Sequence, residues 1–133
     1  AGTPMDFREF KKIGAEIKAD FPALNYGKGY DNCFMINDYE AGQLQTAAQL
    51  YSPLSGRQLE VLTTQPAVQI YTGNWLEGCP AGKCGRGYHD YEGVAIECQH
   101  CPDSPNKPDY PATVLCPGET FSEAIIWAFS VRK

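Results

Sequence analysis

The residue whose type and position point most directly to chemistry is Glu97. It follows the apolar residues 94–96 and precedes a loop that is stiffened by Pro102, Pro105, Pro108 and Pro111. A carboxylate held at the end of an apolar strand is placed to exchange a proton with a bound molecule. The ordinary alternative is a glutamate that is simply solvated at a strand end, and position alone does not separate the two.

Six cysteines form the second set of residues that could carry chemistry. Their even number permits, without requiring, a disulfide framework in an oxidising compartment, and Cys79 and Cys84 flank a turn that could close a local bridge. Together with Cys98 and Cys101 they also loosely resemble a four-thiolate zinc site. The x4 spacing is loose, however, and Cys98 would have to face away from Glu97. We therefore expect no metal and no cofactor, and the cysteine count favours an extracytoplasmic location.

Two histidines are the other groups that could transfer a proton near neutral pH. His100 lies three residues after Glu97, so on a continuing strand it would point to the opposite face. His89 lies among the glycine and tyrosine residues of 87–91. We predict that both are loop residues.

Composition limits the partners that this chain can have. The 133 residues include 11 Lys and Arg against 16 Asp and Glu, and no basic residues cluster with aromatic ones, so we expect no nucleic acid partner. No apolar run approaches the roughly 20 residues that cross a bilayer, so we expect no membrane partner. A hydrophobic content of 43% suits a packed core, and residues 1–133 are expected to belong to one domain.

The elements that must position these residues are mostly short strands. Residues 45–51 and 58–64 flank a loop rich in Ser, Pro and Gly, which predicts an antiparallel pair. The last strand, 124–131, is almost continuously apolar, as expected for a strand covered on both faces. Alternation or apolar runs bounded by turn residues predict the other strands at 33–37, 67–71, 93–98 and 113–115.

Little helix is expected. Residues 3–17 predict one short helix or a few turns, and the Pro, Asn and Gly residues of 20–31 predict a loop that carries Tyr26 and Tyr30. Asp31 then stands just before a strand, and residues 78–87 have no regular pattern. Short strands with almost no helix argue for an antiparallel sandwich.

Six motifs together resemble the aldose 1-epimerase family, also called galactose mutarotase. Each is weak alone, but their order and approximate spacing match the family over the whole chain. They are GTPMDFR (2–8), GYD (29–31), TQPAVQIYTGN (64–74), ECQ (97–99), PDSPN (102–106) and PGE (117–119).

The resemblance implies an all-β fold, the galactose mutarotase-like antiparallel β-supersandwich, of which this chain would be only the C-terminal part. It also implies interconversion of the α and β anomers of aldohexoses such as galactose or glucose. By motif match, Glu97 is expected to be the general base that removes the proton of the anomeric hydroxyl. Asp31 is expected to hydrogen-bond sugar hydroxyls, and Gln69 to line the same cleft.

One expected group is missing. In the family the catalytic acid and a second histidine lie upstream of the segment that matches residues 2–8, and neither His89 nor His100 lies in a matching motif. We therefore expect this chain to need a partner, either the N-terminal portion of the same protein or a second copy. Two alternatives stay open: a non-catalytic carbohydrate-binding module or inactive remnant of the fold, and a structural domain held by disulfides or zinc.

Overall fold

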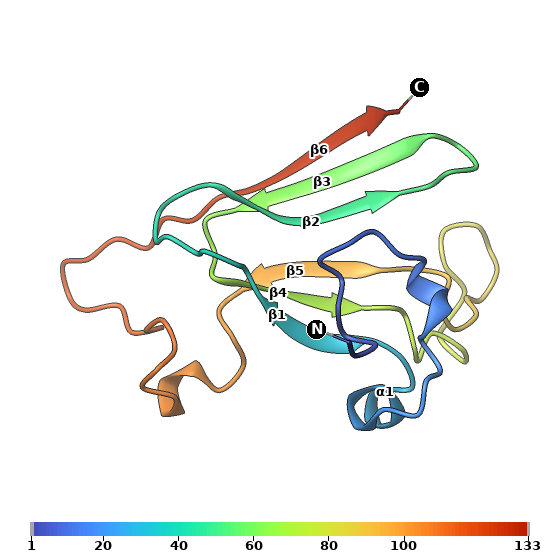
Figure 1. Cartoon of the computed structure of the whole chain (residues 1–133), viewed down its shortest axis with the longest axis horizontal. Helices are drawn as coiled ribbons and strands as arrows, with labels where there is room; N and C mark the ends of the chain where they lie inside the picture. The colour runs from blue at the N-terminus through green and yellow to red at the C-terminus, as the bar shows by residue number, and fades with distance from the viewer. Residues whose placement is uncertain (1, 133) are drawn as a thin grey trace. The chain divides into compact units, whose positions relative to one another are not determined.

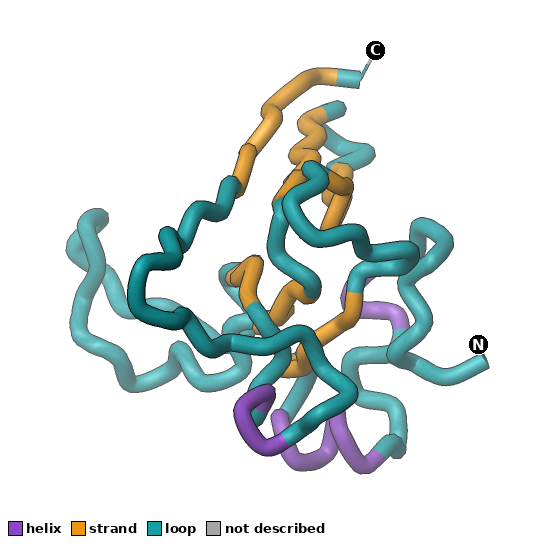
Figure 2. The backbone as a smooth tube through the Cα atoms, turned by 90° about the vertical axis from the view of Figure 1, so that its left-hand side faces the viewer, coloured by secondary structure: helices purple, strands orange, loops and turns teal. Residues whose placement is uncertain are grey.

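The computed structural model describes residues 2–132, which form six short strands, very little helix and long connecting loops (Figures 1 and 2). The all-β class predicted from the sequence is confirmed. Within residues 2–132 no helix has both the length and the apolarity needed to span a membrane. The strands are β1 (Asp31–Met35), β2 (Gln45–Tyr51), β3 (Arg57–Thr63), β4 (Ala67–Tyr71), β5 (Ala95–Gln99) and β6 (Ile125–Val131).

One sheet has the strand order β2-β3-β6, with both neighbouring pairs antiparallel (Figure 1). The predicted pairing of β2 with β3 is confirmed, and its register places Gln49 opposite Glu60. A register shift between Thr46 and Ala48 leaves one extra residue in β2, which is a β-bulge. On the other side of β3, Leu59 lies opposite Phe129 of β6.

The other sheet has the order β1-β4-β5. Two backbone hydrogen bonds flank the first pair: the Thr72 amide donates to the Tyr30 carbonyl (3.0 Å), and the Ile36 amide donates to the Pro66 carbonyl (3.0 Å). Residue numbers rise along one strand as they fall along the other, so β1 and β4 are antiparallel. This register places Cys33 opposite Gln69.

The chain divides into two compact units, each with buried side chains of its own. The first unit is Ala1–Asn32 with Ile70–Ile96, and the second is Cys33–Gln69 with Glu97–Lys133. Buried apolar residues of the first unit include Leu24, Tyr30 and Ile96, and those of the second include Val61, Pro66, Ala67, Val68 and Cys101.

A short helix, α1 (Pro22–Gly27), replaces the loop that was predicted for residues 20–31. Pro22 suits the first turn because its fixed φ matches the helix and its missing amide has no partner to lose there. The helix ends where Lys28 adopts a left-handed conformation and its amide donates to the Leu24 carbonyl. The same Pro and Gly residues that indicated a loop therefore begin and end a helix.

Residues 3–17 form turns and a single 3-10 turn at Ile13–Ala15, which is the second of the two outcomes predicted, one short helix or a few turns. One other prediction needs correction. Residues 113–115, predicted as a strand, have no strand partner in the described chain. The second 3-10 turn, Ser104–Asn106, lies in the proline-rich loop after β5.

The prediction that the last strand is covered on both faces is wrong for this chain. All seven residues of β6 are exposed, including Trp127 and Phe129. The strand order also makes β6 an edge strand, so only β3 pairs with it. Its continuous apolar sequence is therefore left without a covering layer among residues 2–132.

Candidate functional site

Glu97 is the third residue of β5 and its side chain is exposed. Alternation along the strand turns Ile96 and Cys98 to the opposite face, where Ile96 is buried and the Cys98 thiol interacts with the Thr63 hydroxyl. Burial raises the pKa of the Cys98 thiol, with the Thr63 hydroxyl acting in the other direction. The Glu97 carboxylate has no hydrogen bond or ion pair from any other side chain within residues 2–132, so its oxygens face solvent.

Gln69 lies on β4, the strand that neighbours β5 in the sheet. Figure 1 draws the two arrows in opposite directions. Gln69 is half-buried, and it follows Ala67 and Val68, which are buried and anchor the start of the strand. The structure therefore brings Gln69 and Glu97 onto adjacent strands, both within the second unit.

Asp31 belongs to the first unit and is the first residue of β1, which begins two residues earlier than the strand predicted at 33–37. Its side chain is exposed, whereas Tyr30 immediately before it is almost completely buried. The edge of the Phe7 ring packs on the Tyr30 ring at a centroid distance of 5.0 Å, and the Tyr30 hydroxyl donates to the Pro4 carbonyl (3.1 Å). The position of Asp31 is thus tied to a firmly packed neighbour.

Both histidines lie in loops, as predicted. His100 comes one residue after the end of β5, and its Nδ1 atom lies 2.9 Å from Oε1 of Gln65, whose side chain is buried. The backbone N–H of Gln65 donates to the Thr63 hydroxyl (3.1 Å). His100 is therefore held against the connection between β3 and β4. His89 is exposed, and its amide donates to Glu92 (3.2 Å).

Comparison with known proteins decides the family. The family model described as Aldose 1-epimerase matches residues 1–127. The chain belongs to the aldose 1-epimerase family. All six motifs that carried the resemblance in the sequence lie within the matched residues.

The curated relatives of this epimerase-family chain are much longer than it is. Aldose 1-epimerase of Escherichia coli (strain K12) is 40% identical over 131 residues, which are 97% of this chain and 37% of the relative. Galactose mutarotase of Rattus norvegicus is 36% identical over 130 residues, which are 98% of this chain and 36% of the relative. The chain thus spans little more than a third of the relatives it matches.

A solved structure shows the same fold. The GalM/aldose epimerase homologue from C. elegans superimposes with a TM-score of 0.75 at 25% identity, over 99% of this chain and 38% of that one. The predicted galactose mutarotase-like fold is therefore confirmed. The roles expected for Glu97, Asp31 and Gln69 stay predictions.

The six cysteines of this epimerase-family chain are all free thiols. Cys33 on β1 and Cys101 after β5 interact with each other; burial first, and then the Cys101 thiol, raise the pKa of Cys33 to about 12. Among residues 2–132 no three His, Cys, Asp or Glu side chains come together as metal ligands. The disulfides or zinc of the structural-domain alternative therefore have no counterpart there.

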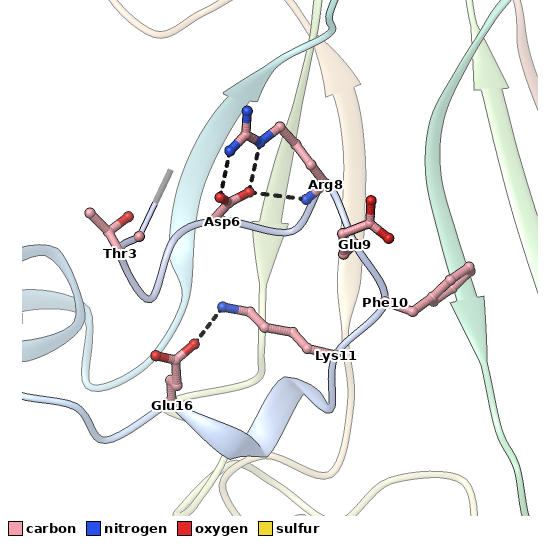
Figure 3. A pocket seen from close by; sticks show the side chains of 8 residues that line it. Thr3, Asp6, Arg8, Glu9, Phe10, Lys11 and Glu16 are labelled. Atoms are coloured by element: carbon pink, nitrogen blue, oxygen red, sulfur yellow. Dashed lines mark hydrogen bonds and ion pairs between the residues drawn. The ribbon is translucent and has the colours of Figure 1, made fainter.

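A surface hollow is lined only by residues between 2 and 16 (Figure 3). None of the residues predicted to act on the sugar belongs to this segment. Arg8 forms a two-pronged ion pair with Asp6 (2.7 and 2.9 Å), and this pair holds the pKa of the Asp6 carboxyl well below its usual range. Lys11 pairs with Glu16 (2.6 Å). Both cationic side chains that line the hollow are thus paired with carboxylates, so neither is left unpaired to attract an anion. None of Glu97, Asp31 and Gln69 lines it.

Proposed function

We propose that this chain carries one wall of the active site of an aldose 1-epimerase that interconverts the α and β anomers of an aldohexose such as galactose or glucose. The observation that carries the proposal is the exposed carboxylate of Glu97, which no other side chain engages within residues 2–132 and which lies in a motif of the family. A base must reach its substrate without first breaking an ion pair. Glu97 meets that condition.

The reaction explains why a carboxylate is needed. Glu97 takes the proton of the C1 hydroxyl while an acid delivers a proton to the ring oxygen; the bond from C1 to the ring oxygen breaks and a C1 carbonyl forms. Rotation about the bond between C1 and C2 and reclosure on the other face yield the second anomer. The proton transfers then reverse, so the reaction needs no cofactor and no net proton.

Asp31 and Gln69 are proposed to bind the sugar. A carboxylate accepts hydrogen bonds from hydroxyls, and an amide side chain both donates and accepts, so the two residue types suit a polyhydroxylated ring. Both lie on well-formed strands, which hold side chains more precisely than loops do.

The acid is proposed to come from a portion of the protein that this chain does not contain, because the relatives are almost three times as long and both histidines here lie in loops outside the family motifs. The exposed apolar strand β6 supports such a partner, since a strand of this composition is normally covered. The partner is either the N-terminal portion of the same protein or a second copy. This chain alone is then inactive, and residues 1–133 are part of one larger domain.

The proposal is tested with a chimaera in which this chain replaces the segment that it matches in the E. coli aldose 1-epimerase. Polarimetry of freshly dissolved α-galactose measures the rate. We expect the chimaera to accelerate mutarotation and the 133-residue chain alone not to do so. Replacing Glu97 with Gln in the chimaera removes the base at nearly constant shape and should lower kcat by about 10²- to 10⁴-fold.

Glu40→Gln is the matched control, because Glu40 is exposed, lies away from the family motifs and makes no side-chain bond in the described chain. It should leave the rate unchanged. A chimaera that binds galactose but never accelerates mutarotation would favour the carbohydrate-binding alternative. Activity that survives Glu97→Gln would assign the base to another residue.

A further inference from the structure

The turn that follows β4 contains two polar side chains that are almost fully buried. Asn74 is 0% exposed and Thr72 is 2% exposed. Their hydrogen bonds are complete: the Thr72 hydroxyl donates to Oδ1 of Asn74 (2.6 Å), and Nδ2 of Asn74 donates to two backbone carbonyls. Burying polar groups in this way requires that each finds a partner, so the arrangement is geometrically demanding.

The partners of this turn are the residues that lead into Asp31. Nδ2 of Asn74 donates to the carbonyls of Gly27 (2.7 Å) and Tyr30 (2.9 Å), and the Tyr30 amide donates to the Thr72 hydroxyl (3.2 Å). One side chain therefore joins the end of α1 to the start of β1. Asp31 is the next residue after this junction.

The junction also has no spare room. A Cβ atom added to Gly29 would lie 2.5 Å from Oδ1 of Asn74, and Gly29 has a φ of +146°. The backbone of residues 27–30 thus lies directly against the Asn74 amide. Small shifts of that amide must move the backbone that carries Asp31.

We propose that Asn74 is a positioning residue for Asp31: it fixes the backbone before β1 so that the exposed Asp31 carboxylate stays where the sugar binds. This inference rests on the proposed function, in which Asp31 contacts sugar hydroxyls. Asn74 itself is buried and touches no substrate. It acts only through the segment that it holds.

The test uses Asn74→Asp, which keeps the shape of the side chain and replaces its two donors by an oxygen that faces two carbonyls. In the chimaera, we expect KM for galactose to rise about tenfold or more while kcat changes little, as for loss of one hydrogen bond to a charged group. In an Asp31→Asn background, the same change should raise KM no further. Equal KM effects in both backgrounds would overturn the inference, because Asn74 would then not act through Asp31.

A second measurement needs no activity. In the 133-residue chain, the ¹⁵N order parameter of the Asp31 amide should be about 0.85, as for rigid backbone, and should fall in Asn74→Asp. Asn37→Asp, an exposed site with the same charge change, is the control and should leave it unchanged. An unchanged order parameter in folded Asn74→Asp overturns the inference, whereas an inactive parent chimaera contradicts only the proposed function.

If Asn74→Asp yields too little folded protein, Thr72 carries the same test. Thr72→Val removes the hydroxyl that bonds Asn74 and Tyr30, and Thr72→Ser retains it. We expect Thr72→Val to raise KM and lower the Asp31 order parameter, and Thr72→Ser to restore both. Equal behaviour of the two variants would count against positioning through this network.

Discussion

Gly29 leaves no room for a side chain of its own, because the Asn74 side chain lies directly against its backbone. The φ of +146° strains any residue with a Cβ, and that Cβ would also overlap the buried Asn74 amide. We expect Gly29→Ala to lower the free energy of unfolding by about 3 kcal/mol, measured by urea denaturation. Gly42→Ala is the comparison, since Gly42 also has a positive φ (+76°) but nothing within 4 Å. Its cost should stay near 1 kcal/mol; equal costs would refute the overlap.

Residue by residue, the sequence was informative about Glu97 and uninformative about Asn74. The motif 97–99 and the apolar residues before it were enough to place Glu97 on a strand, and the structure places it on β5. The motif 64–74 indicated only that residues 72–74 follow the strand 67–71, with Gly and Asn as ordinary turn residues. The burial of Asn74 depends on Gly27 and Tyr30, which lie more than forty residues earlier, and local pattern carries no information about such a contact. A turn asparagine within a family motif was the one available indication.

Between elements, an ion pair fastens α1 to the loop before β5. The Lys28 ammonium pairs with the Asp90 carboxylate and lies 4.7 Å from the centre of the Trp75 ring, and the Tyr91 hydroxyl donates to the Lys28 carbonyl (2.6 Å). Asp90 also accepts the Glu77 amide (2.9 Å). The hydrogen bond from Lys28, followed by that from the Glu77 amide, lowers the pKa of Asp90.

Because the pKa of Asp90 is lowered in the folded chain, the free energy of unfolding depends on pH. A carboxyl whose pKa is lower in the folded chain stabilises it above the unfolded value of about 4, and the contribution is lost as pH falls further. Asp90→Asn keeps an oxygen for the Glu77 amide but removes the charge. We expect it to destabilise the chain more at pH 7 than at pH 3 in urea denaturation. An equal difference at both pH values would contradict a charge effect.

Strands were easier to predict than the other elements. The predicted bounds of β2 and β4 are those observed, because each is a compact apolar or alternating run between turn residues. The helix α1 was missed because six residues are too few to show a helical period. Residues 113–115 have strand-forming side chains but no neighbouring strand in the described chain, and propensity alone does not supply one.

For the molecule as a whole, the notable feature is that the apolar strand β6 is exposed along its whole length. One face of this strand carries Ile125, Trp127, Phe129 and Val131, and all are between 46% and 75% exposed. Its outer edge has no paired strand within residues 2–132. An exposed apolar edge of this kind promotes association with other chains. The continuous apolar sequence predicted a strand covered on both faces, whereas no element within residues 2–132 covers it.

Phe129→Lys tests what covers that strand. Phe129 is 75% exposed, so in the 133-residue chain the substitution should change the free energy of unfolding by no more than about 0.5 kcal/mol and reduce self-association in sedimentation velocity. In the chimaera, the added portion should cover β6, and a buried lysine would then cost stability and activity. Leu54→Lys, fully exposed in the turn between β2 and β3, should affect neither protein. If Phe129→Lys leaves the chimaera unchanged, β6 is not the surface that the rest of an epimerase covers.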